Sequence, residues 1–306
     1  MTGTVAPPAE PRLGRAPAIA LAGALTIAFS AILVREAGVH PATAAFYRCA
    51  YAVPVLVLLA WRERARYGPR APGQQRLALI AGLFFAADLI CWHQAIADVG
   101  AGLATVLGNL QVVIVPFVAW AVLAEAPGRR ILAALPLTLI GVVLISGALE
   151  EGAYGAHPAR GVLFGALTGV AYAGFILILR HGNEDLRRPA GPLFDATWVG
   201  AVASLAVALA LGVDDLAPEW PSAGWLVLLA LSSQVLGWLL ISVSLPRLPA
   251  ALTSMILTIQ PVGSIVLGIV LLGEEPSALQ LAGAACILAG LVSVALARRR
   301  VQGPAS

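Results

Sequence analysis

The sequence contains no lysine, and all 19 of its lysine-or-arginine positions are arginine. A nucleotide-binding P-loop needs a lysine beside the phosphates, and retinal or pyridoxal phosphate is held through a lysine Schiff base. The absence of lysine therefore excludes these chemistries, and we expect no cofactor. Any energy that the protein uses must come from a source other than ATP bound at a P-loop.

Cysteine is also scarce, and its three positions show no paired spacing. Cys49, Cys91 and Cys286 each lie inside an apolar stretch. Such isolated positions predict neither a disulfide framework nor a cysteine-based metal site. We interpret the three residues as small hydrophobic side chains, and we expect no metal centre.

Charged residues make up only 11% of the chain, whereas hydrophobic residues make up 59% and the mean hydropathy is +0.89. Soluble domains carry about 25% charged residues. A membrane helix needs roughly 20 consecutive apolar residues, and the chain has about ten such stretches. The loops are too short for a second soluble domain, so we expect an all-α membrane protein. The expected spans are 16–34, 42–61, 77–97, 101–123, 131–148, 161–179, 193–212, 223–245, 248–272 and 278–297.

The net charge of +3 does not indicate a nucleic-acid partner, because the arginines cluster beside the membrane segments. If the N-terminus is cytoplasmic, the opposite side of the membrane holds only Arg35 and Arg160 among the loop arginines. This asymmetry obeys the positive-inside rule in every loop. We therefore expect a multi-pass membrane protein with both termini in the cytoplasm.

The second half of the chain repeats the first. Residues 101–147 align with residues 250–296 at a constant offset of 149, which pairs Gln111 with Gln260 and Glu125 with Glu274. Five spans per repeat is an odd number, so the repeats must be inverted in the membrane. We expect a cytoplasmic tail at 1–15, a first five-helix repeat at 16–148, a second at 161–297 and a cytoplasmic tail at 298–306.

Asp88 is the most informative polar residue, because it falls near the midplane of the third span. It lies twelve residues after Arg76 and ten before Asp98. A carboxylate at that depth must be paired, protonated or hydrated. Two alternatives stay open: an internal ion pair with Arg48 on the second span, or contact with a substrate or proton.

Trp92 follows Asp88 by one helical turn and shares its face. A carboxylate beside an indole suits an amine or an aromatic ring. His93 lies about 140° around the helix from Asp88, so the two cannot form a simple acid–base pair on a straight helix. A histidine near a helix end more often makes a hydrogen bond between helices, with a direct functional role as the alternative.

The midplane glutamines are candidates for contact with a substrate. Gln111 and Gln260 are repeat partners that fall halfway through their spans, and Gln234 is at the polar centre of the eighth span. Amides bridge helices as readily as they bind ligands, so a structural role is the alternative for each. Pro261 lies at mid-membrane and is the expected gating kink.

The two repeats differ in their ionisable groups. The offset of 149 places Gly237 opposite Asp88 and Ser242 opposite His93. The first repeat therefore supplies the one charged wall of a site between the repeats. A carboxylate that can be protonated there offers a route to proton coupling.

The end of each repeat resembles the EamA-type transporters of the drug/metabolite transporter superfamily. The resemblance rests on the segment Leu-Leu-Gly-Glu-Glu-Pro at 271–276 and on the residues that follow it in the last span, Gln280, Gly283 and Gly290. The first repeat matches the same pattern at Glu125, Gly141 and 101–104. Arg48 resembles an arginine common in the family's second span. The resemblance implies a ten-helix inverted-repeat secondary carrier, commonly an exporter of amino acids, metabolites or drugs in bacterial inner membranes.

The first repeat departs from the family pattern at two positions. Val112 stands opposite Pro261, a proline occurs at 116 instead, and Ala124 replaces the glycine before Glu125. Kinks at Pro116 and Pro261 would lie at different depths. These departures leave the expected fold unchanged but argue against symmetric gating.

A carrier explains the duplication, the midplane polar groups and the short loops together. A channel would show rings of like residues around an axis. A membrane-embedded enzyme would gather its catalytic groups, whereas the four histidines lie in separate loops and spans. We therefore expect a carrier rather than an enzyme. Its expected partners are a small-molecule substrate and the lipid bilayer, with a homodimer as an open alternative to a monomer.

Overall fold

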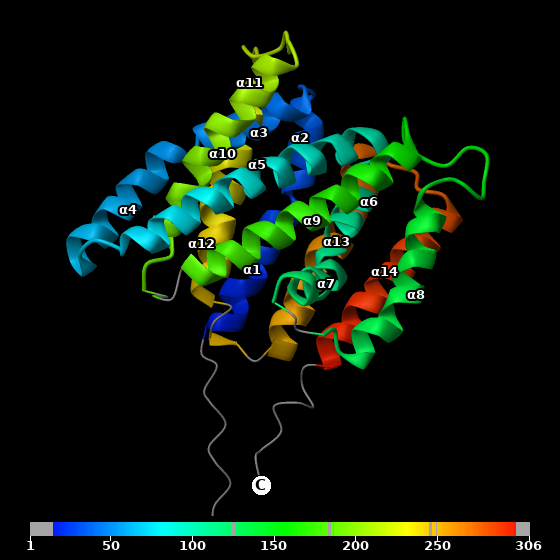
Figure 1. Cartoon of the computed structure of the whole chain (residues 1–306). Helices are drawn as coiled ribbons and strands as arrows, with labels where there is room; N and C mark the ends of the chain where they lie inside the picture. The colour runs from blue at the N-terminus through cyan, green and yellow to red at the C-terminus, as the bar shows by residue number, and fades with distance from the viewer. Residues whose placement is uncertain are drawn as a thin grey trace, which may run out of the picture.

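The computed structural model describes residues 15–123, 126–182, 185, 187–244, 247–248 and 250–297 (Figure 1). Within these ranges every regular element is a helix. Ala124 and Glu125, which belong to the repeat signature, lie outside the described residues. The all-α architecture expected from composition is confirmed for the part of the chain that is described.

The helices are numbered along the chain as in Figure 1. Their bounds are α1 Ala16–Ala28, α2 Ser30–Ala37, α3 Pro41–Ala50, α4 Val53–Tyr67, α5 Pro72–Val99, α6 Ala101–Gly108, α7 Gln111–Leu123, α8 Arg129–Ile145, α9 Pro158–Gly182, α10 Ala190–Ala210, α11 Ser222–Leu229, η1 Ala230–Gly237, α12 Trp238–Ser244, α13 Ala250–Leu272 and α14 Ala278–Ala297.

Seven helical stretches are long and apolar enough to cross a membrane. They are Ala16–Ala37, Pro41–Tyr67, Pro72–Val99, Ala101–Val118, Pro158–Leu179, Ala190–Ala210 and Ser222–Ser244. Three shorter apolar helices, Ile131–Ile145, Ile256–Leu272 and Ala278–Val294, fall where the remaining spans are expected. The protein is a multi-pass membrane protein, and the count of ten spans stays a prediction.

Several spans consist of more than one helix. The first breaks at Phe29, the second at Tyr51 and Ala52, and the fourth at Asn109 and Leu110. The eighth contains a π-helix, η1, between α11 and α12. A π-helix widens the turn and is frequent at functional sites. In this chain it carries Gln234.

The break in the fourth span lies at Asn109 and not at Pro116, which sits inside the continuous helix α7. Asn109 donates its side-chain amide to the carbonyl of Thr105 at 2.8 Å. Such a bond competes for the carbonyl that continues the helix. Val112 is the repeat partner of Pro261. The break at Asn109 and Leu110 therefore falls within three residues of the position that corresponds to Pro261 in α13. The kinks expected at Pro116 and Pro261 stay predictions, because both prolines lie inside continuous helices, α7 and α13.

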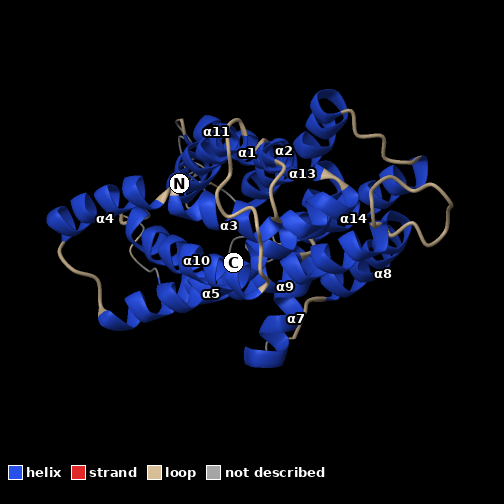
Figure 2. Ribbon diagram, turned by 90° about the horizontal axis from the view of Figure 1, so that it is seen from above, coloured by secondary structure: helices blue, strands red, loops and turns tan. Residues whose placement is uncertain are grey.

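Close packing joins equivalent elements of the two repeats. Helices α8 and α14 run side by side in both views (Figures 1 and 2). A Cβ on Gly141 would lie 2.5 Å from the carbonyl oxygen of Gly283, and a Cβ on Gly283 would lie 2.6 Å from that of Gly141. Small residues permit this approach, as is typical of membrane helices. Helix α6 likewise packs on α13, and α10 packs on α3 and α4.

The inverted arrangement predicts that the turn before α8 and the turn before α14 lie on opposite faces of the membrane. In a cysteine-free background, we expect an impermeant thiol reagent added outside cells to label Ala278→Cys and to spare Gly128→Cys. Both positions are exposed in the structure. Labelling of both from the same face would contradict the inverted model.

Candidate functional site

A polar cluster lies between the two repeats, centred on the guanidinium of Arg48. Arg48, on α3, is only 3% exposed. Its Nε donates to Oε1 of Gln234 at 3.1 Å, and its Nη2 donates to the hydroxyl of Ser233 at 3.3 Å. Both partners come from η1, so an arginine of the first repeat is held by the second.

Gln234 extends this cluster to a third helix. Its side chain is 0% exposed, and Nε2 donates to the hydroxyl of Thr197 on α10 at 3.0 Å. The amide therefore accepts from Arg48 and donates to Thr197. Every partner of the buried guanidinium is neutral, so its positive charge is not cancelled by a contact.

Asp88, on α5, is 7% exposed and lies near Arg48 without forming an ion pair with it. The salt bridges of the described residues do not include this pair. Nη1 of Arg48 is buried and has no hydrogen-bond partner in the described structure. A buried charged group without a partner is costly, so Nη1 offers a donor to a bound molecule or water. Of the two alternatives for Asp88, a direct ion pair with Arg48 is not formed.

Aromatic rings border the two charges. The Arg48 guanidinium lies 5.6 Å from the centroid of the Trp92 ring, within cation–π range. Tyr172 on α9 lies near both charges and forms a hydrogen bond with Gln111. Its ring centroid is 6.3 Å from that of Trp238 on α12. These rings give the site a wall suited to apolar or aromatic groups.

Three residues of this site were not identified from the sequence: Tyr172, Thr197 and Trp238. Each lies in an apolar span, where an aromatic ring or a threonine resembles ordinary helix packing. Their position inside membrane spans is the signal that could have singled them out.

His93 and the paired glutamines are placed differently. Nδ1 of His93 lies 3.2 Å from the carbonyl oxygen of Pro41, which joins α5 to the start of α3. This contact matches the alternative of a bond between helices. Gln111 and Gln260 are both partly buried, and no hydrogen bond joins them in the described structure. Pro261 is buried within α13, which continues through it.

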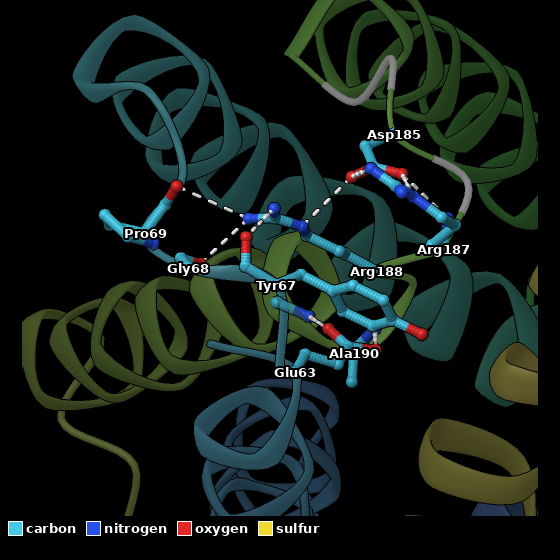
Figure 3. Close-up of polar contacts among 9 residues, drawn as sticks. Glu63, Tyr67, Gly68, Pro69, Asp185, Arg187, Arg188 and Ala190 are labelled. Atoms are coloured by element: carbon cyan, nitrogen blue, oxygen red, sulfur yellow. Dashed lines mark hydrogen bonds and ion pairs between the residues drawn. The ribbon is translucent and has the colours of Figure 1, made fainter. Parts of the chain in front are cut away.

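A second polar network lies where α4 ends and α10 begins (Figure 3). Glu63 accepts from the amides of Ala190 at 2.9 Å and Gly191 at 2.8 Å. Arg188 donates to the carbonyls of Tyr67 and of Gly68, the latter at 2.9 Å. These bonds tie the two repeats together at the face that carries most loop arginines.

Charges around this second network are paired with one another. Arg70 forms an ion pair with Asp195. Burial lowers the pKa of Arg70; the nearby Glu63 opposes this shift and Arg188 adds to it. Hydrogen bonding from Arg187 lowers the pKa of Asp185 to about 2. The adjoining pocket has a volume of about 220 Å³. Nη1 of Arg70 has no hydrogen-bond partner in the described structure. Because the carboxylates of the network are paired with the other donors around it, we assign the network a structural role.

Among the described residues no group of three His, Cys, Asp or Glu side chains could hold a metal ion. The polar groups of the central cluster are a guanidinium, a carboxylate, amides and hydroxyls. These groups can bind a small polar molecule through charge and hydrogen bonds.

The contact between Arg48 and Gln234 predicts a large effect of Gln234→Leu on stability. The substitution removes the acceptor at Nε of a buried guanidinium, which costs about 3 kcal/mol. Thermal unfolding of purified protein in detergent should show a lower midpoint. The control is Ser232→Ala, because the Ser232 hydroxyl bonds only to its own helix, at the carbonyl of Leu228. Equal midpoints for the two variants would contradict the proposed importance of this contact.

Comparisons with known proteins agree with the architecture. A solved crystal structure resembles this chain with a TM-score of 0.60 and 18% sequence identity, and the match covers 94% of this chain and 99% of the other. At that identity the likeness shows the fold alone. No curated protein matches the sequence. The EamA-like transporter family, by contrast, matches residues 15–147 and 159–296, one match in each repeat. The chain therefore belongs to the EamA-like transporter family.

Proposed function

We propose that this protein is a secondary carrier that exports small metabolites by alternating access between its two inverted repeats. The observation that carries this proposal is the pair of buried charges, Arg48 and Asp88, which lie near each other between the repeats without a direct ion pair. Unpaired charges at membrane depth are expensive and mark substrate or ion pathways.

The chemistry of the site favours amino acids, amines or drug-like compounds with a charged group and an apolar part. Asp88 supplies a carboxylate for an ammonium group, and Nη1 of Arg48 supplies a free donor for an acceptor such as a carboxylate. Trp92 and Tyr172 border these charges and suit an aromatic or aliphatic portion. Gln111, Gln234 and Gln260 are the neutral groups proposed to line or support the pathway.

Asp88 is also the proposed coupling residue. A carboxylate that binds either a proton or a cationic substrate makes the two compete for one site, which couples their movement in opposite directions. Energy then comes from the proton gradient rather than from a nucleotide.

The orientation that fits the arginine distribution places both termini in the cytoplasm of a bacterium, with the protein in the inner membrane. The exposed hydrophobic side chains support a lipid environment, since Trp61, Trp120 and Val270 all lie more than half exposed. A homodimer is compatible with these surfaces.

The first test is counterflow in proteoliposomes with labelled amino acids, amines and nucleosides. We expect saturable exchange of one class by the wild type and a loss of about tenfold in Asp88→Asn, which removes a charged partner of the substrate. Glu36→Gln serves as a control, because Glu36 is an exposed carboxylate. Exchange that is unsaturable, or a ligand that is chemically changed, would instead favour a channel or an enzyme.

Coupling is tested separately in the same vesicles. If Asp88 couples protons to substrate, Asp88→Asn should keep downhill exchange in part and lose all response to an imposed pH gradient. Flux is measured with and without the gradient at equal substrate concentrations. A variant that still responds to the gradient would assign coupling to another group.

A further inference from the structure

Two pairs of repeat-related spans pack against each other and are tied together in different ways. In the first pair, helices α3 and α4 lie against α10. Glu63 binds the amides at the start of α10, while at the opposite face Asp215 accepts from the amide of His40 at 2.5 Å and from the hydroxyl of Thr43 at 2.7 Å. Both ends of this pair are therefore held at the same time.

The second pair consists of α6 and α13, and a single carboxylate holds its described end. Glu274, just beyond α13, accepts from the amide of Ala101 at 2.6 Å and from the amide of Gly102 at 3.1 Å. Glu274 is 3% exposed although it lies in a connecting loop. A carboxylate at the positive end of a helix makes strong, charge-assisted hydrogen bonds. We call this contact the Glu274 clamp.

Two glycines shape the space around the clamp. Gly100 has φ +91°, and a Cβ added to it would lie 2.8 Å from Oε1 of Glu274. A Cβ on Gly268 would collide with Oε2 of the same side chain. The amide of Glu274 donates to the carbonyl of Gly268 at 3.1 Å. The carboxylate can reach the start of α6 only because both positions lack a side chain.

Helix α6 is a short segment with a break at each end. It joins α5 through Gly100, and its other end is the break at Asn109 and Leu110. On the side toward α13 it is packed closely, since a Cβ on Gly102 would lie 2.8 Å from the Cα of Ile265. Gln111 and Gln260 lie further into the membrane along these two spans. The clamp therefore joins α6 to the end of α13 at one end of the two spans that carry the central glutamines.

We propose that the Glu274 clamp is the latch of the gate on this face, which is the external face in the orientation proposed above. Its two hydrogen bonds hold the carrier closed and break each time the site opens outward. The inference rests on the proposed carrier function. The contacts of Glu63 and Asp215 fix a pair of spans at both faces. The clamp instead joins α6, a short segment that ends at the break at Asn109 and Leu110, to α13, which carries Pro261.

The test measures access to α6 from outside the cell. The reporter is Thr105→Cys in a background without other cysteines, because Thr105 is partly buried one turn beyond the clamp. An impermeant thiol reagent is added to intact cells. We expect Glu274→Gln to raise the labelling rate roughly tenfold, since a neutral amide replaces a charged acceptor of two bonds. Glu275→Gln is the matched control, because this neighbouring glutamate is exposed.

A second variant disrupts the same contact without removing the charge of Glu274. Gly268→Ala should displace the carboxylate and raise labelling in the same direction, whereas Gly263→Ala on the same helix has more room and should not. A cytoplasmic reporter, Gly128→Cys, labelled in inverted vesicles, identifies general unfolding. Labelling that rises at both faces would mean that Glu274 merely stabilises the fold and would overturn the latch.

A counterflow assay distinguishes a failure of the latch proposal from a failure of the proposed carrier function. If Glu274→Gln raises external labelling while no tested compound shows counterflow, the latch stands and the substrate proposal fails. If the wild type shows counterflow and neither Glu274→Gln nor Gly268→Ala changes external labelling, the latch is wrong and the carrier stands.

Discussion

Backbone groups at the ends of membrane helices need hydrogen-bond partners from the protein, because hydrocarbon supplies none. Among the described residues, three helix starts are served by carboxylates from the opposite repeat: Glu63 at α10, Asp215 at α3 and Glu274 at α6. Each carboxylate therefore satisfies a helix end and joins the repeats in one contact. The same requirement therefore determines three places where the described parts of the two repeats are held together.

The buried guanidinium at the centre of the molecule also needs hydrogen-bond partners from the protein, and its partners are neutral side chains rather than carboxylates. Arg48 of the first repeat is satisfied by Gln234 and Ser233 of the second, and these neutral partners leave its charge in place. The π-helix that carries both residues gives the eighth span its polar centre. A site with uncancelled charge between two repeats can attract a charged molecule, which a fully paired cluster could not.

The sequence predicted the membrane fold, the duplication and four members of the central cluster: Arg48, Asp88, Trp92 and Gln234. Arg48, Asp88 and Gln234 stand out because polar groups are rare at membrane depth, and Trp92 stands out because it shares a helix face with Asp88. It did not predict Tyr172 or Thr197, whose surroundings in the sequence are those of packing residues. It placed kinks at Pro116 and Pro261, but it did not predict the break of the fourth span at Asn109 and Leu110, where the Asn109 side chain bonds to the carbonyl of Thr105. Proline is a strong local signal, but the competition for a carbonyl by a neighbouring side chain is not visible in a hydropathy pattern.

Hydropathy and periodic duplication are local properties, so the sequence by itself determined that the chain crosses the membrane repeatedly and that its halves share one plan. The partners of buried charges are not local. Glu274 binds an amide 173 positions away in the chain, and Arg48 binds a glutamine 186 positions away. Which of the many polar groups meet depends on how helices of opposite repeats cross, and that crossing is set by the packing of small side chains in three dimensions.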